Sequence, residues 1–498
     1  MIPESIKLPL QCSLREALSI YAERLGIFLL IALFNVFIFV VAIGIINLAI
    51  GAWQFVLIGL LTCSVCVVVW VVWNNRDAME ERNNIGDKGT PIKERASNLS
   101  RISAEELLHR EPIYIDTDSI SVLLAKKRVL VTGGGSPIGS ELCRQILNYS
   151  VATLIILDHS DDSVFAIIQK LSHYVQGLPK NERPHLEAVI ADIRFRDRLK
   201  HVFAVEKPDI VFHVANHNHV SLMERNPTEA ISKNVLGTRN VLSASLSAGV
   251  GRFVMLSSTK AINPTSIMGA SKRCAELIVR HAAERSGLPY VVVRIGNLLD
   301  DQGSLVSIFK EQIARGGPVT VTHPHMARYY MSIHEAVQLA LQAAVLGSGG
   351  ETFILDMGEP VNISQLAQDL IELCGYEVGR DIDLVYSELR PGEKLFEELF
   401  IEGKTYARTA HTKIFQDIDP AASLPADLDE LVDTLVAMAT SNDIEAMIRT
   451  LQTVIPEYSP MNTLESRRQQ PPVPLVKSDL EKARSQKADS GKLSENWF

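Results

Sequence analysis

Six short apolar runs constrain the fold of this chain more than any other feature. Helix-like patterns separate them, so the sequence alternates between strand and helix from residue 128 to residue 296. Strands that are apolar on both faces belong to a parallel sheet covered by helices on both sides. We therefore expect an α/β fold with a doubly wound parallel sheet of the Rossmann type. The runs are RVLVTG (128–133), TLIILD (153–158), EAVIAD (187–192), DIVFHVA (209–215), RFVMLSS (252–258) and YVVVRIG (290–296).

A glycine-rich turn follows the first run. Gly133, Gly135 and Gly139 lie between a strand and a helix, which lets the backbone approach a pyrophosphate at the helix N-terminus. The second run ends at Asp158, at the distance where an acid binds the adenosine ribose, and a carboxylate there repels a 2′-phosphate. We expect NAD rather than NADP; an ordinary turn with a capping aspartate is the alternative. The predicted cofactor-binding residues of this unit are Thr132, Gly133, Gly135, Ser136, Ile138, Gly139, Asp158, Asp192 and Ile193.

Two uncharged segments near the start of the sequence are each long enough to cross a bilayer as a helix. They cover residues 27–50 and 55–73 and are joined by the short sequence GAWQ, so we expect a tight transmembrane hairpin over 27–73. Basic residues flank the hairpin on both sides and none lies in the joint, which predicts cytoplasmic ends. Residues 1–26 carry an amphipathic pattern, typical of a surface helix or of an extension of the first span. A buried helical hairpin is the alternative.

The remaining segments are distinguished by composition. We expect a charged linker over 74–125, the dinucleotide-binding domain over 126–403, with a smaller substrate subdomain from about 295, a helical extension over 404–456 and a disordered tail over 457–498. The net charge of −9 argues against nucleic acid as a partner. The six cysteines lack the spacing of a disulfide framework, and the C-x-x-C pair, Cys63 and Cys66, lies in an apolar run. We expect no metal site.

The stretch SSTKAINPTSIMGASK, residues 257–272, has the spacing of a short-chain oxidoreductase active site. In such sites a strand ends in Ser or Thr, and an aromatic hydroxyl lies four residues before a lysine. Here Met268 occupies the position of that hydroxyl before Lys272, and a thioether has no proton to donate. The sequence therefore raises the question of which group moves protons in this site.

Several motifs together resemble the membrane-anchored nucleotide-sugar 4,6-dehydratases of bacterial polysaccharide biosynthesis. Those enzymes are extended short-chain dehydrogenases that act on UDP-N-acetylglucosamine, and the resemblance covers residues 126–403. It implies NAD as cofactor, a UDP-sugar as substrate, and a soluble domain on the cytoplasmic side of the bacterial inner membrane. The motifs are VTGGGSPIGSELCRQI (131–146), PDIVFHVANHNHVSLMERNPTEAISKNVLGTRNV (208–241), MGASKRCAE (268–276), GGPVTVTHPHMARYYMSIHEAVQLALQA (316–343) and LRPGEKLFEEL (389–399).

The family's reaction transfers a hydride from C4 of the sugar to NAD, eliminates water across C5 and C6, and returns the hydride to C6. The resemblance implies catalytic roles for Ser258, Thr259, Lys260, Met268 and Lys272. A methionine like Met268 is common in the membrane-anchored branch, Lys272 would hold the nicotinamide ribose, and Lys260 would be the base of the elimination. Thr259 stands where the family has the aspartic acid, and a threonine hydroxyl is a poor proton donor near neutral pH.

Other positions depart from the family pattern as well. Ser136 replaces a glycine beside the phosphates, which is expected to weaken cofactor binding. In the loop after the fourth run Asn218 replaces a lysine, His219 is kept and His217 is new. A histidine has a pKa suited to proton transfer at neutral pH, so His217 has either a catalytic or a packing role.

The substrate side resembles the family more closely. The resemblance places Arg294 and Asn297 at the UDP end, Arg390 at the diphosphate, and Glu393 at the uridine ribose. The implied substrate-binding residues are His219, Asn263, Asn297, Ser304, Lys310, Arg328, Arg390 and Glu393.

Three functions stay open on the sequence alone. The first is a 4,6-dehydratase with an altered acid, the second a UDP-sugar C4 epimerase or oxidoreductase, and the third a non-catalytic nucleotide-sugar-binding partner. Dehydration removes one water from the substrate, whereas epimerisation leaves its mass unchanged. Homo-oligomerisation and association with other enzymes of polysaccharide biosynthesis are also open.

Overall fold

The computed structural model describes residues 113–461, except 181, 300–303, 402, 419–423 and 426. The segments predicted at 1–26 and 27–73, most of the predicted linker, and the tail from residue 462 lie outside these residues. Within the described ranges no helix is both long and apolar enough to cross a bilayer. The hairpin over 27–73 therefore stays a prediction.

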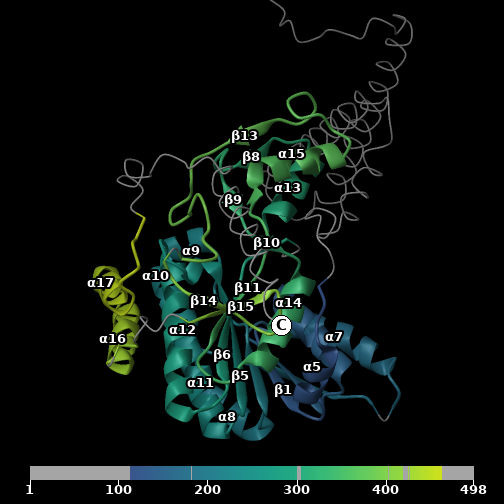
Figure 1. Cartoon of the computed structure of the whole chain (residues 1–498), viewed down its shortest axis with the longest axis vertical. Helices are drawn as coiled ribbons and strands as arrows, with labels where there is room; N and C mark the ends of the chain where they lie inside the picture. The colour runs from purple at the N-terminus through teal and green to yellow at the C-terminus, as the bar shows by residue number, and fades with distance from the viewer. Residues whose placement is uncertain are drawn as a thin grey trace, which may run out of the picture. The chain divides into compact units, whose positions relative to one another are not determined.

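A nine-stranded sheet forms the centre of the described residues (Figure 1). Its order is β14-β15-β11-β6-β5-β4-β1-β2-β3, parallel from β3 to β11 and antiparallel at β15 and β14. The six predicted runs form β1 to β6, which confirms the doubly wound parallel sheet. The strands are β1 (Arg128–Thr132), β2 (Thr153–Asp158), β3 (His185–Ile190), β4 (Ile210–His213), β5 (Arg252–Ser258), β6 (Tyr290–Ile295), β11 (Thr352–Leu355), β14 (Tyr406–Arg408) and β15 (Ile414–Asp417).

Helices cover both faces of this sheet and enclose a hydrophobic core on each. Successive side chains of one strand enter opposite cores, as Leu130 does on one side and Val129 and Val131 on the other. One face carries α8 (Arg196–Glu206), α9 (Val220–Arg225), α10 (Pro227–Ala230), the π-helical turn η2 (Ile231–Leu236), α11 (Gly237–Ala248), α12 (Ile267–Ser286), α16 (Leu428–Ser441) and α17 (Ile444–Val454). The other carries α5 (Thr117–Leu124), α6 (Pro137–Ile146), α7 (Asp161–Gln176) and α14 (Ile333–Leu346).

A smaller subdomain with its own core lies where the sequence places substrate-binding segments, from about residue 295. Phe309, Leu366 and Ile371 are among its buried side chains. In Figure 1 this subdomain lies beyond the ends of the central strands, and its strand β10 is the element nearest to them. Its elements are β7 (Asn297–Leu298), α13 (Leu305–Ala314), β8 (Val319–Val321), β9 (Ala327–Arg328), β10 (Tyr330–Met331), β12 (Val361–Asn362), α15 (Ile363–Leu373) and β13 (Leu384–Tyr386).

Three predicted boundaries are wrong. The disordered tail expected over 457–498 overlaps the folded residues, because Tyr458 is 3% exposed and packs in the core. The linker expected over 74–125 overlaps α5, whose Ile120 and Leu124 are fully buried in the core beside α14. The helical extension expected over 404–456 begins instead with β14 and β15, which complete the central sheet before α16 and α17 follow. Both strands are short and partly polar, so they lack the apolar run that identifies a central strand.

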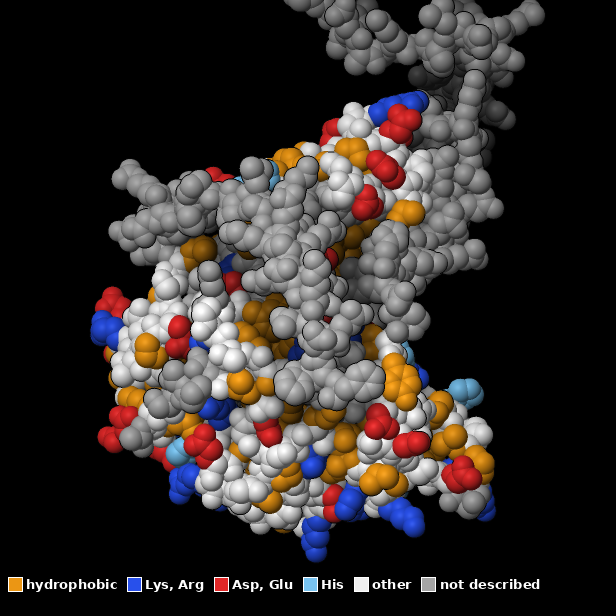
Figure 2. Space-filling model, viewed as in Figure 1, with side chains coloured by type: hydrophobic (Ala, Val, Ile, Leu, Met, Phe, Trp, Pro, Cys, Tyr) orange, Lys and Arg blue, Asp and Glu red, His pale blue; other side chains and the backbone are white. Residues whose placement is uncertain are grey.

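Charged side chains of both signs are mixed on the face shown in Figure 2. Lys and Arg lie among Asp and Glu along its lower border rather than in a field of one sign.

Candidate active site

The glycine-rich turn after β1 can be built only from glycine at two of its positions. Gly133 has φ +70°, and a Cβ there would lie 2.7 Å from the backbone nitrogen of Ala215. A Cβ on Gly139 would lie 2.1 Å from the carbonyl oxygen of Gly133. The start of α6 therefore packs directly against the turn, as a dinucleotide-binding unit requires.

Ser136 has a structural role in this turn that sequence reasoning missed. Its hydroxyl accepts a hydrogen bond from the backbone N–H of Gly139 at 3.1 Å and donates one to the carbonyl of Gly133 at 2.7 Å. It is the N-cap of α6, and Pro137 follows at the first helical position. The serine therefore stabilises the start of the helix, and the expected weakening of cofactor binding stays a prediction.

Asp158 ends β2 beside this turn. One of its carboxylate oxygens accepts the N–H of Gly135 at 3.1 Å, and the other accepts the N–H of His159 at 2.7 Å. Asp158 also lines the large cavity described below. The structure therefore brings the predicted ribose-binding carboxylate to the phosphate turn.

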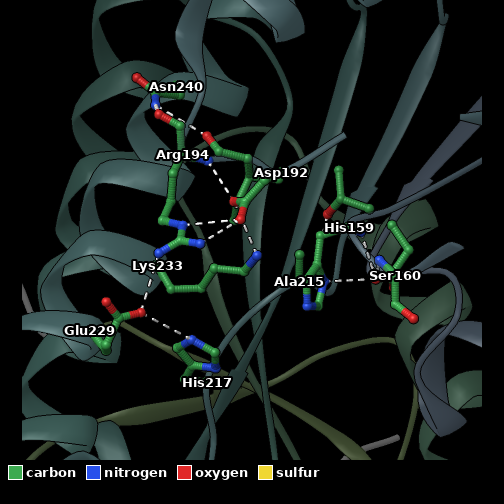
Figure 3. Close-up of polar contacts among 12 residues, drawn as sticks. His159, Ser160, Asp192, Arg194, Ala215, His217, Glu229, Lys233 and Asn240 are labelled. Atoms are coloured by element: carbon green, nitrogen blue, oxygen red, sulfur yellow. Dashed lines mark hydrogen bonds and ion pairs between the residues drawn. The ribbon is translucent and has the colours of Figure 1, made fainter. Parts of the chain in front are cut away.

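Asp192 belongs to a charged cluster shown in Figure 3. Its carboxylate accepts hydrogen bonds from Arg194 Nη2 at 2.8 Å and from the nearly buried Lys233 Nζ at 3.2 Å. Burial opposes ionisation, but these partners outweigh it and lower the pKa of Asp192. Glu229 joins the cluster through Arg194, and His217 Nε2 lies 3.9 Å from Glu229. His217 thus points to this cluster, and burial lowers its pKa.

Asn234, which sequence reasoning did not select, holds the loop that carries His217. Its side-chain oxygen accepts the backbone N–H of His217 at 2.8 Å, and its amide donates to the carbonyl of the same residue at 3.0 Å. The amide also donates to Ser271 Oγ at 2.9 Å. Asn234 therefore ties this loop to α12, the helix that carries Met268 and Lys272. It lies inside a motif quoted for the resemblance, which was the available signal.

A cavity of about 570 Å³ brings most of the predicted site residues together. It reaches from the glycine-rich turn to the small subdomain and is lined by residues of both. The predicted residues that line it are Gly133, Ser136, Ile138, Asp158, Ile193, His219, Ser258, Lys260, Met268, Lys272, Asn297, Ser304, Arg328, Arg390 and Glu393. The predicted residues outside the lining are Thr132, Gly135, Gly139, Asp192, Thr259, Asn263 and Lys310.

Lys272 lies in the cavity wall one helical turn after Met268, as the spacing predicts. It is 3% exposed, and its Nζ donates to the carbonyl of Leu256 at 2.8 Å. Burial lowers the pKa of Lys272 to about 8, because the charged form loses hydration. Met268 is buried beside it and offers the cavity no ionisable group.

Lys260 meets a carboxylate that sequence reasoning did not select. Its Nζ lies 3.0 Å from Glu397 Oε1 and donates to Asn297 Oδ1 at 2.6 Å. Glu397 lines the cavity and comes from the segment that follows the RPGEK motif. The available signal was its place in LFEEL, at the end of a motif quoted for the resemblance.

Arg328 is buried and holds the segment that contains Lys394 and Glu397 in place. Its Nη2 donates to the carbonyl of Lys394 at 2.6 Å, and its Nε lies 3.3 Å from Glu397. Arg390 is exposed at the cavity, and its backbone N–H donates to Glu393 at 3.0 Å. The two predicted arginines differ in exposure: Arg328 is 6% exposed, whereas Arg390 is exposed to solvent.

Arg294 is a correction. The resemblance placed it at the UDP end, but its guanidinium is 2% exposed and does not line the cavity. It makes two hydrogen bonds with Glu276, at 3.0 and 2.7 Å, beneath β6 and α12. A charged side chain at the end of a strand can point into the core when it pairs with a buried residue of opposite charge, and Glu276 is that residue.

The chain combines a doubly wound sheet, a dinucleotide-type turn and a cavity shared with a small subdomain. These features define a protein of the Rossmann class. The chain belongs to the polysaccharide biosynthesis protein family, whose model matches residues 129–418.

The chain is also similar to three individual proteins. The capsular polysaccharide biosynthesis protein CapD of Staphylococcus aureus is 44% identical over 321 residues, which cover 64% of this chain and 53% of CapD. The chain thus spans about half the length of that relative. The UDP-glucose 4-epimerase of Rickettsia canadensis is 32% identical over 280 residues, 56% of this chain and 78% of that protein. The X-ray structure of Pen from Bacillus thuringiensis matches with 30% identity and a TM-score of 0.54, covering 60% of this chain and 88% of Pen.

Proposed function

We propose that the chain is an NAD-dependent UDP-N-acetylhexosamine 4,6-dehydratase of polysaccharide biosynthesis, of the extended short-chain dehydrogenase type. The observation that carries this proposal is the shared cavity. The glycine-rich turn, Lys260, Lys272 and the Arg390–Glu393 segment all line it. Hydride transfer requires the sugar and the cofactor to lie in contact, and one cavity with both sets of residues supplies that arrangement.

The residues of the turn fit a dinucleotide. The glycines let α6 start beneath the turn, so its N-terminus is available to a pyrophosphate. Asp158 would accept hydrogen bonds from the adenosine ribose and would repel a 2′-phosphate, which favours NAD over NADP. When bound, NAD would accept the hydride from C4 of the sugar and return it to C6.

The chain's own residues would bind and orient the substrate and the cofactor. Arg390 would hold the diphosphate at the cavity mouth, and Glu393 would hold the uridine ribose. Lys260 would face the sugar, and Lys272 would fix the nicotinamide ribose. Met268 would contribute packing alone, because it has no exchangeable proton.

Product analysis tests the proposed reaction. Purified protein incubated with UDP-N-acetylglucosamine and NAD is expected to yield a nucleotide sugar lighter by one water, detected by mass spectrometry. A parallel reaction with NADP in place of NAD is expected to give little product, because Asp158 repels the extra phosphate. Recovery of unaltered substrate at every enzyme concentration would exclude the dehydratase.

A C4 epimerase is the second candidate function. Thr259 supports it, because this side chain lies outside the cavity lining and leaves the position of the family's acid without one. The similarity to a UDP-glucose 4-epimerase is in keeping with this alternative. The same mass measurement separates the candidates, since an epimerised product keeps the substrate's mass and differs in chromatographic retention. Binding without any change of the sugar would instead favour a non-catalytic partner.

We further propose that residues 27–73 tether the enzyme to the bacterial inner membrane, with the domain from residue 113 on the cytoplasmic side. Two uncharged segments of spanning length support this. After carbonate extraction the full chain is expected in the membrane pellet, whereas a variant without residues 1–73 is expected in the supernatant. Release of the full chain by carbonate would rule out the spanning hairpin.

A further inference from the structure

The side chain of residue 259 does not face the cavity. Thr259 is 1% exposed, and its hydroxyl donates to Glu397 Oε2 at 3.3 Å. The two residues are 138 positions apart in the sequence. The side chain at the position of the family's aspartic acid therefore contacts the carboxylate of Glu397.

Glu397 is held by four side chains. Oε1 lies 3.0 Å from Lys260 Nζ and 3.3 Å from Arg328 Nε. Oε2 accepts from Asn297 Nδ2 at 2.8 Å and from Thr259 Oγ1 at 3.3 Å. Each oxygen thus has two donors, which is a nearly complete set for a carboxylate. The side chain is only 4% exposed, so its position is fixed by these contacts.

The charge state of Glu397 follows from this environment. Burial opposes its ionisation, but the positive charges of Lys260 and Arg328 outweigh burial and lower the pKa of Glu397. An ionised carboxylate cannot give up a proton, so Glu397 does not replace the missing acid directly. Its effect must pass through the cation that it touches at the cavity wall.

Lys260 is that cation. An ammonium group has three donors, and the structure gives Lys260 Nζ two side-chain acceptors, Glu397 and Asn297. The lysine side chain is 24% exposed and lines the cavity. Two contacts fix the direction of the group, and its remaining N–H is available to an oxygen of a bound sugar.

We propose that Glu397 is a positioning residue, which fixes the amino group of Lys260 at the cavity wall with one N–H directed to the substrate. Thr259 belongs to the same assembly, as a hydrogen-bond donor to the carboxylate. The cation that meets the sugar is then Lys260, and residue 259 supports it from behind. The catalytic consequence rests on the proposed function, whereas the ion pair itself does not.

Amine labelling of Lys260 tests the pair without any sugar nucleotide. The full-length protein is exposed at fixed pH to an amine-acylating reagent, and the modification of Lys260 is followed by peptide mass spectrometry. Glu397→Gln keeps the shape but replaces the salt bridge to Lys260 by a weaker neutral contact, so the amine is released from its partner. We therefore expect Lys260 to react about 10- to 100-fold faster, the factor given by loss of a hydrogen bond to a charged group.

The matched control is Glu398→Gln, the same change one residue further along. Glu398 pairs with Lys394 rather than with Lys260, so the labelling of Lys260 is expected to stay at the wild-type rate. Equal labelling of Lys260 in Glu397→Gln and Glu398→Gln would overturn the proposal. If Glu397→Gln fails to fold, Glu397→Ala decides, because it also removes the carboxylate: faster labelling of Lys260 supports the pair and a wild-type rate contradicts it.

Kinetics then test the consequence for catalysis. In an active enzyme Glu397→Gln is expected to lower kcat with little change in KM, and Glu397→Asp is expected to restore part of kcat. Unchanged kcat in Glu397→Gln would refute the positioning role. A wild-type protein that forms no product contradicts the proposed function instead, and the labelling result still decides whether the pair exists.

Discussion

Lys272→Met is expected to abolish most turnover while making the cofactor-free protein more stable. The side chain lies in the cavity wall and is nearly inaccessible to solvent, with a backbone carbonyl as its hydrogen-bond acceptor. Loss of a group that orients cofactor and substrate is expected to lower kcat at least about 100-fold. Methionine fills similar volume without a charge, so the core is expected to tolerate it.

The gain in stability has a defined pH dependence. Burial lowers the pKa of Lys272 from 10.5 to about 8, so the folded state binds the proton less tightly than the unfolded chain does. Below pH 8 this costs the wild type about 3 kcal/mol, and the cost disappears as the pH rises from 8 to 10.5. The unfolding free energy of Lys272→Met should therefore exceed that of the wild type at pH 7 and approach it above pH 10.

Denaturant unfolding and steady-state kinetics of the same preparations check both parts. Lys413→Met is the control, because Lys413 pairs with Asp356 outside the cavity lining. It is expected to keep wild-type kcat and to change stability by less than about 0.5 kcal/mol. Wild-type turnover in Lys272→Met would show that Lys272 has no role in catalysis. A variant less stable than the wild type at pH 7 would show that the buried amine does not destabilise the fold.

Glu276→Ala is expected to destabilise the protein by about 3–5 kcal/mol, the largest effect on folding that we anticipate. The carboxylate is fully buried and accepts two hydrogen bonds from Arg294, one from Arg273 and one from Ser257. Its removal leaves the Arg294 guanidinium without its closest partner in the core. Burial opposes ionisation of Glu276, but Arg294 outweighs it and lowers the pKa of Glu276 to about 2.

Chemical denaturation of three proteins checks this expectation. Glu445→Ala removes an exposed partner of Arg449 and is expected to cost less than about 0.5 kcal/mol. The double variant Glu276→Leu with Arg294→Met removes both charges and is expected to recover much of the lost stability, because neither charge is left unpaired. A Glu276→Ala protein as stable as Glu445→Ala would disprove the role of this ion pair. The Glu276 contribution should also fade as the pH falls from 4.5 toward 2.

The central strands could be predicted because burial on both faces leaves a mark in the sequence. Val129, Leu130 and Val131 show this, since each must be apolar whichever core it enters. The strand β11 and the antiparallel pair β14 and β15 escaped prediction. All three are short, β14 and β15 are partly polar, and β11 pairs with strands that lie far away along the chain, so local pattern gives little sign of them.

Many of the residues that line the cavity could be selected from the sequence, but the pairs that they form could not. The spacing identified Lys272 and the family resemblance identified Lys260, and both line the cavity. No spacing indicated that Thr259 would face Glu397, because the fold alone brings these two segments together. Nor can sequence distinguish a cavity arginine from a core arginine. Arg294 and Arg390 are both charges in family-like motifs, yet one lies in the core and the other at the cavity.

The helices α16 and α17 lie after residue 418, where the family match ends. Nevertheless, Leu435 and Leu451 are fully buried in the same core as α12. The backbone of Ser459 also donates to the carbonyl of Pro264, at 3.1 Å, just before α12 begins. The end of the family match is therefore not the limit of the folding unit. A truncated protein meant to retain an intact cavity must extend to about residue 461, because its C-terminal helices support the helix that carries Met268 and Lys272.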